Sequence, residues 1–245
     1  MMLDRIAAYW DTRAEGYSES IHAELAGGGA DEYRSLLRQA LPEGRKRTAL
    51  DMGCGPGLFT LLLNEMGVCV TSADYSPGML ERTEQNCAEA GYSANTVRTD
   101  AQALPFADAS FDFVCSRNLV WNLEAPERAY SEWMRVLRPG GRLLVCDGNH
   151  YLHYYHEDYR RERAQALAQG RAAEHSTGGV DPAPINEIAR ELPLSRELRP
   201  EWDERTLSAL GLRRINVRRF ERIFKDDESG EEKKLTHRFA LWGEK

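Results

Sequence analysis

The feature that most constrains the fold of this chain is a glycine-rich stretch at residues 50–60, which reads LDMGCGPGLFT. An apolar lead-in ends at the acid Asp51, three glycines follow at alternate positions, and an apolar helical segment begins near Leu58. Glycine suits such a turn because a Cβ would hold a ligand away from the backbone and because tight turns often need a positive φ. The stretch therefore predicts a strand, a tight turn and a helix, the opening of a nucleotide-binding α/β unit.

The spacing of these glycines argues against a dinucleotide. Leu58 stands where the fingerprint G-x-G-x-x-G needs its last glycine, and a pyrophosphate site at a helix N-terminus would keep that residue. The pattern D-x-G-x-G-x-G instead resembles motif I of the class I S-adenosylmethionine-dependent methyltransferases, of the small-molecule, type 11-like kind. This resemblance implies S-adenosyl-L-methionine as the cofactor.

Apolar strand-like segments alternate with helical patterns through the first two thirds of the chain, which predicts parallel βαβ units. We expect an α/β fold with a Rossmann-like seven-stranded methyltransferase sheet, helices on both faces and the last two strands as an antiparallel hairpin. The expected strands are 47–51, 68–73, 96–99, 111–116, 142–146, 215–224 and 235–242. The expected parts are an N-terminal helical cap (1–40), a cofactor-binding core (41–149), a helical lid inserted after strand five (150–199) and the rest of the core (200–245).

Composition narrows the class of protein. The net charge of −7 makes a nucleic-acid substrate unlikely, although arginines at 213, 214, 218, 219 and 222 keep RNA binding open. The five cysteines are scattered singly, so neither a disulfide framework nor a zinc site is expected. We find no signal peptide and no apolar run that approaches the ~20 residues of a membrane span, so a cytoplasmic location is expected.

The resemblance to the methyltransferases also implies roles for individual residues. Asp51 would accept from the methionine amino group while the backbone of Gly53, Cys54 and Gly55 approaches the cofactor. Asp74, at the end of the second strand, would accept both ribose hydroxyls, because a carboxylate offers the two acceptors that a vicinal diol needs. The residues implied around the adenine and the rest of the cofactor are Tyr75, Met79, Asp100, Ala101 and Asn118.

Residues 9–17, YWDTRAEGY, resemble an opening segment that folds over the cofactor in many of these enzymes. There a tyrosine or an arginine reaches the methionine carboxylate, which implies Tyr17 and Arg13 here. An ordinary amphipathic helix with aromatic core anchors is the alternative.

Substrate contact is expected from two segments. Trp121 and Asn122 follow the fourth strand, at the edge where open α/β sheets bind ligands, although Trp121 could instead pack the next helix. Residues 150–159, HYLHYYHEDY, begin where the fifth strand ends. On a helix His150 and His153 would share a face, as tentative catalytic bases, with Tyr154 near the substrate. A polar lid with solvated histidines and a poorly formed metal site are the other interpretations.

We therefore expect methyl transfer from S-adenosylmethionine to a small-molecule acceptor by in-line displacement, in a monomer or homodimer. The alternatives are a non-catalytic, methyltransferase-like cofactor-binding or scaffold protein, a nicotinamide-dependent oxidoreductase and an RNA methyltransferase. The acceptor atom (N, O, S or C) stays open.

Overall fold

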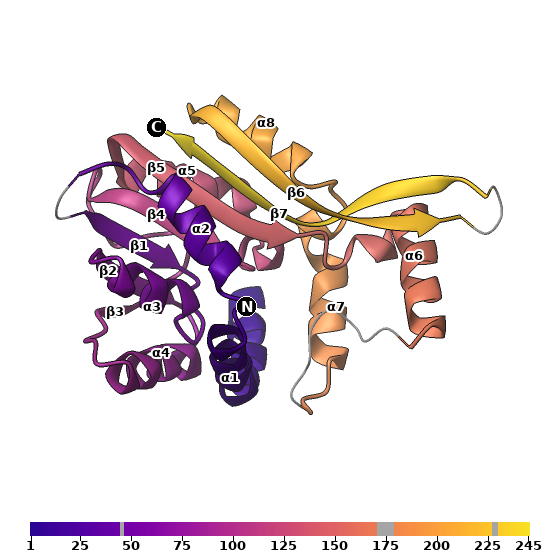
Figure 1. The fold of residues 1–245 in the computed structure, drawn as a ribbon, viewed down its shortest axis with the longest axis horizontal. Helices are drawn as coiled ribbons and strands as arrows, with labels where there is room; N and C mark the ends of the chain where they lie inside the picture. Colours follow the sequence, from indigo (N-terminus) through magenta and orange to yellow (C-terminus); the bar gives the residue numbers. More distant parts are fainter. Residues whose placement is uncertain (45–46, 171–178, 227–229) are drawn as a thin grey trace.

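The computed structural model describes residues 1–44, 47–170, 179–226 and 230–245 and contains one seven-stranded sheet (Figure 1). The strand order is β3-β2-β1-β4-β5-β7-β6. The first five strands run parallel, and β7 is antiparallel to both of its neighbours. The sheet expected from the sequence, with its terminal antiparallel hairpin, is confirmed.

The strands are β1 (Thr48–Met52), β2 (Cys69–Asp74), β3 (Thr96–Arg98), β4 (Phe111–Arg117), β5 (Leu137–Gly148), β6 (Arg213–Lys225) and β7 (Glu232–Glu244). The α-helices are α1 (Met2–Ala26), α2 (Asp31–Ala40), α3 (Leu58–Glu65), α4 (Pro77–Glu89), α5 (Pro126–Val136), α6 (Glu157–Ala168), α7 (Ala183–Glu191) and α8 (Glu201–Ala209). Short 3-10 turns are η1 (Val120–Asn122), η2 (Leu152–Tyr154) and η3 (Pro193–Ser195). The expected fifth strand began at Arg142, but β5 begins at Leu137, which pairs with Phe111 of β4.

Helices cover both faces of the sheet because its central strands are apolar on both sides. On one face, Tyr130 and Trp133 of α5 and Trp202 of α8 pack with side chains of β4, β5 and β7. On the other face, Leu36 of α2 and Phe59 of α3 belong to a second apolar cluster. The sheet is therefore held rigidly between two helical layers, with its carboxyl edge left to the loops.

Helix α1 lies beside α4, below the carboxyl ends of the strands in Figure 1. Asp11 of α1 accepts hydrogen bonds from the Ser76 hydroxyl (2.5 Å) and the Gly78 backbone N–H (3.0 Å) at the start of α4. Arg82 donates to Glu15 (2.7 Å) one turn further along. These contacts fix α1 against the core of the protein.

The segment between β5 and α8 divides into two parts. Helix α7 packs on α1 and Trp121 through Ile185 and Ile188. Helix α6 lies under the far end of the β6–β7 hairpin, where Tyr159 packs with Phe224 and Leu235 (Figure 1). Part of the expected lid, residues 171–178, lies outside the described residues.

The single helix considered for residues 150–159 is not what forms, and this corrects the proposed pairing of His150 with His153. Asn149 continues the pairing with β7, since its N–H donates to the His237 carbonyl. Its side chain also donates to the Arg199 and Thr236 carbonyls (both 2.8 Å). The chain is thereby held in a bend and one 3-10 turn, and α6 begins only at Glu157.

Candidate functional site

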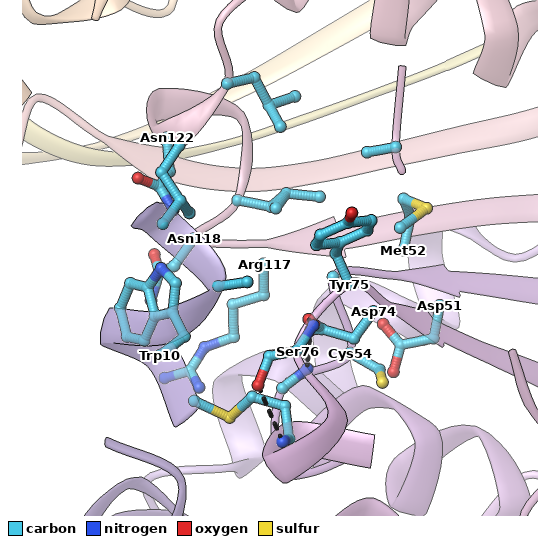
Figure 2. Close-up of a pocket in the computed structure, with 18 of the residues that line it drawn as sticks. Trp10, Asp51, Met52, Cys54, Asp74, Tyr75, Ser76, Arg117, Asn118 and Asn122 are labelled. Carbon is cyan, nitrogen blue, oxygen red and sulfur yellow. Dashed lines mark hydrogen bonds between the residues drawn. The ribbon is translucent and has the colours of Figure 1, made fainter. Parts of the chain in front are cut away.

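A cavity of about 860 Å³, including its open mouth, lies at the carboxyl ends of β1, β2 and β4 (Figure 2). This edge of an open α/β sheet is where such folds bind their ligands. Helix α1 closes one side with the apolar side chains of Leu3, Ile6, Ala7 and Trp10. The cavity is thus mostly apolar, with a few acids at the strand ends.

The glycine turn after β1 forms the floor of the cavity. Gly53 has a φ of +65° and Gly55 a φ of +53°, which side chains rarely adopt. A Cβ on Gly53 would come within 2.6 Å of Leu119, and one on Gly55 would approach the Tyr17 ring at 3.5 Å. The backbone is therefore open to a ligand only because these residues have no side chain.

We predict that Gly53→Ala weakens cofactor binding about tenfold or more, because Leu119 must move inside the cavity. A loss of stability of about 1 kcal/mol should accompany it from the positive φ. Gly67→Ala is the matched control, because Gly67 also has a positive φ (+71°) but has nothing within 4 Å of its Cβ position. Calorimetric titration and thermal unfolding of both variants test this, and equal binding by the two would contradict it.

Asp51 is the last residue but one of β1 and is almost wholly buried, at 1 % exposure. Its Oδ2 accepts a hydrogen bond from the Thr60 hydroxyl (2.7 Å) in α3. Burial raises the pKa of Asp51 to about 7, and the hydrogen bonds from Thr60 oppose part of that rise. Its carboxyl group therefore titrates near neutral pH, and a cation nearby would favour the ionised form.

Asp74 ends β2 and links the two neighbouring turns. One carboxylate oxygen accepts from the Gly55 backbone N–H (3.0 Å), and the other accepts from the Ser76 N–H (3.0 Å). Burial raises the pKa of Asp74 against the effect of these hydrogen bonds. Each oxygen keeps a second lone pair, so the group can still accept from a vicinal diol.

Asp100 and Ala101 follow β3 and lie further along the same edge. Asp100 Oδ1 accepts from the backbone N–H (2.9 Å) and side-chain amide (3.0 Å) of Gln102, and the Ala101 carbonyl accepts from Trp133 Nε1 (3.1 Å). Tyr75 presents one ring face to the Arg98 guanidinium at 5.0 Å. An adenine-sized ring would meet a carboxylate edge and apolar walls here.

The structure brings most of the sequence-predicted cofactor residues to this one cavity. Those that line it are Tyr17, Asp51, Gly53, Cys54, Gly55, Asp74, Tyr75, Met79, Asp100, Ala101 and Asn118, together with the predicted substrate residue Asn122. Their roles toward a cofactor stay predictions.

The other predicted residues lie outside the set that lines the cavity. Arg13 is buried on α1 near Tyr9, whose pKa burial raises and Arg13 lowers. Trp121 packs on Trp10 with ring centroids 6.4 Å apart, so it supports the wall from behind. Tyr154 packs on Tyr151 (5.8 Å) and lies one layer further out.

The two histidines proposed as bases also lie outside this set. His150 is buried, with Nε2 3.3 Å from Asp147 Oδ1 and its ring 5.6 Å from that of Trp121. His153 packs against Tyr154 at 4.3 Å. Both flank the aromatic layer behind Trp10, which the helical spacing of the sequence could not show.

Trp10 and Arg117 are among the lining residues that the sequence did not identify as site residues. Trp10 belongs to the resembling segment 9–17 but was not assigned to the site. Arg117 is the last residue of β4, and a charged residue at the carboxyl end of a strand was the available signal. Arg117 Nε and Asn122 Oδ1 are buried and have no hydrogen-bond partner among the described residues.

These features fit an adenosine with an amino-acid tail. The glycine turn leaves backbone space that a Cβ would fill, two acids stand where ribose and adenine would lie, and one donor and one acceptor are left for a ligand. Among the described residues, no three His, Cys, Asp or Glu side chains gather as metal ligands. None of the helices in the described ranges has the length and apolar character that crossing a bilayer requires.

Comparison with known proteins agrees with this fit. Residues 50–145 match a family model described as a methyltransferase domain. A demethylmenaquinone methyltransferase of Mycolicibacterium paratuberculosis is 39 % identical over 120 residues, which is 49 % of this chain and 50 % of that protein. A protein of the same name from Renibacterium salmoninarum is 32 % identical over 147 residues, 60 % of each chain. The matches thus span about half the length of these relatives.

Solved structures resemble this chain over more of its length. A SAM-dependent methyltransferase of Thermotoga maritima has a TM-score of 0.58 at 19 % identity and covers 96 % of this chain and 99 % of its own. One from Archaeoglobus fulgidus has a TM-score of 0.56 at 18 % identity, covering 93 % and 99 %. The chain therefore has the fold of these SAM-dependent methyltransferases, and its residues 50–145 match the family model of a methyltransferase domain.

Proposed function

We propose that this protein transfers the methyl group of S-adenosylmethionine to a small-molecule acceptor. The observation that carries the proposal is the convergence of Asp51, Asp74 and Asp100 with the glycine turn on one cavity. Each acid lies near the carboxyl end of a different parallel strand, so the sheet itself would space them along a single elongated ligand. Asp74 would hold the ribose, Asp100 and Ala101 the adenine, and Asp51 the amino group.

The donor's sulfonium supplies an already activated methyl group. The protein then has to hold donor and acceptor in line and keep water away, which is largely a matter of positioning. Trp10 and the apolar residues of α1 close the cavity, and Asn122 Oδ1 would accept a hydrogen bond from the acceptor's N–H or O–H. His150 and His153 would shape the wall behind Trp10, and a role as base stays a prediction.

The identity of the methyl acceptor is a separate question from that of the methyl donor. The named relatives are demethylmenaquinone methyltransferases, but their similarity covers about half of their own length. A demethylated quinol is therefore the first acceptor to test, beside small amines and thiols. Cytoplasmic location and a monomeric or dimeric state stay predictions.

The test of the proposal is calorimetric titration with S-adenosylmethionine, S-adenosylhomocysteine and NAD. We expect micromolar binding of the first two and none of NAD, because Leu58 occupies the position of the missing glycine. Tight binding of NAD would favour the oxidoreductase instead. Cofactor binding without transfer to any acceptor, including RNA, would favour the non-catalytic alternative.

We further predict that cofactor affinity depends on pH through Asp51. The pKa of Asp51 is raised to about 7 in the free protein, so below that pH the carboxyl is mostly neutral. Binding an ammonium group favours the ionised form, so binding must release this proton at low pH. Affinity for S-adenosylhomocysteine should fall by up to about tenfold per pH unit as the pH falls below 7 and level off above it.

Asp51→Asn is the control for this pH dependence. The amide keeps an acceptor for the Thr60 hydroxyl but has no proton to lose near pH 7. The variant should bind S-adenosylhomocysteine more weakly at pH 8 and show a flat profile between pH 6 and 8. A wild-type profile that is already flat would remove Asp51 from contact with the amino group.

A further inference from the structure

Arg117 places a buried positive charge at the edge of the cavity. Its side chain is only 15 % exposed, and Nη2 donates to both carboxylate oxygens of Glu24 in α1 (3.1 and 3.0 Å). The guanidinium also lies 4.6 Å from the centre of the Tyr33 ring in α2. Two helices of the N-terminal cap therefore fix the plane of this guanidinium.

The hydrogen bonds to Glu24 use only Nη2 of Arg117. Its Nε–H is buried and has no hydrogen-bond partner within the described part of the chain. Buried donors are nearly always satisfied, so an open one beside a cavity is available to a ligand. Figure 2 shows the side chain between Trp10 and the group formed by Asp51, Cys54 and Asp74.

The surroundings of Arg117 define what this ligand group would be. Arg117 is near enough to Asp51 for its charge to oppose the rise in the pKa of that carboxyl that burial causes. Tyr17 lies over Gly55 and also interacts electrostatically with Arg117. One end of the cavity therefore offers a cation and an acid together, which matches the carboxylate and ammonium of an α-amino acid.

We propose that Arg117 binds the α-carboxylate of the cofactor's amino-acid tail and so selects tailed over tailless adenosines. Glu24 is the positioning residue that holds the guanidinium, whose planar fork suits a carboxylate. This assignment rests on the proposed function and moves the carboxylate contact from Arg13, which does not line the cavity, to the end of β4.

The experiment compares two ligands that differ only at the tail. S-adenosylhomocysteine carries the amino acid, whereas 5′-methylthioadenosine ends at the thioether. In Arg117→Met we expect the Kd of S-adenosylhomocysteine to rise about 10- to 150-fold, the range for a charged hydrogen-bond partner, and that of methylthioadenosine to stay within about threefold.

Three further variants separate the loss of the ligand contact from effects on folding. Arg117→Met combined with Glu24→Gln removes both charges of the pair, so no partly buried carboxylate is left unpaired, and it should show the same selective loss. Arg13→Met is the matched control and should bind both ligands as the wild type does. Glu24→Gln alone should weaken S-adenosylhomocysteine less than Arg117→Met does.

The remaining outcomes separate the role of Arg117 from the proposed function. Equal weakening of both ligands, unchanged binding of S-adenosylhomocysteine, or a selective loss in Arg13→Met instead would overturn the role of Arg117. A wild-type protein that binds neither ligand would refute the proposed function itself.

Discussion

Replacing Asp74 with alanine should weaken S-adenosylhomocysteine binding by roughly 2–4 kcal/mol, which is about 30- to 1,000-fold. The variant removes the acceptor for both ribose hydroxyls. It also leaves the Gly55 and Ser76 N–H groups without the carboxylate that they donate to now. We therefore expect a loss of stability of about 1–2 kcal/mol besides the loss of binding, since two backbone donors lose their partner.

Calorimetry measures the binding loss, and urea unfolding measures the stability loss. Asp108→Ala is the control, since Asp108 is an exposed acid in a loop and pairs with Arg135 (2.8 Å) away from the residues that line the cavity. It should bind the cofactor as the wild type does. A folded Asp74→Ala protein with wild-type affinity would remove Asp74 from the ribose site.

Replacing Arg199 with methionine should destabilise the protein by about 3–5 kcal/mol, the cost of breaking a buried ion pair by removing one partner. Arg199 is fully buried and pairs with Asp147 (2.9 Å) and Asp203 (2.7 Å), whose side chains are also fully buried. Asp203 in turn accepts a hydrogen bond from the Tyr130 hydroxyl. The network ties the start of α8 to the end of β5 and to α5.

The pH dependence of this network has a defined sign. Burial raises the pKa of Asp147, but Arg199 and His150 outweigh that effect and hold the pKa below its usual value. Asp147 therefore stabilises the fold above its unfolded pKa, and this contribution is lost as the pH falls through the lower folded value. Arg199→Met lacks this contribution at every pH, so its loss of stability relative to the wild type should be largest near neutral pH and should shrink as the pH falls.

Urea unfolding at pH 7 tests the size of the effect. Arg219→Met is the matched control, because Arg219 pairs with Glu201 (3.2 Å) and Glu204 (3.5 Å) at the surface of the same helix α8. Losing exposed ion pairs of this kind should lower the free energy of unfolding by no more than about 1 kcal/mol. Similar losses in the two variants would show that the buried network does not hold α8 to the sheet.

The sequence predicted the sheet well because its signals are local. Periodicity located six of the strands to within a few residues, whereas β5 begins five residues before the expected strand. The helix predicted for residues 150–159 does not form, for the opposite reason. Helical spacing favoured one face for His150 and His153, whereas bonds from Asn149 to Arg199 and Thr236, distant in the chain, hold the segment in a bend.

What the sequence determined by itself is the row of acids at the carboxyl edge. Asp51, Asp74 and Asp100 each lie near the carboxyl end of a parallel strand. The carboxyl ends of such strands share one edge, so the order of elements alone brings the three together. Only the tertiary structure decided which charged groups join them. Arg117 meets Glu24 from 93 positions away, and Arg199 meets Asp147 across the insertion. No local pattern encodes such pairs, because each exists only where packing removes water and leaves two opposite charges facing each other.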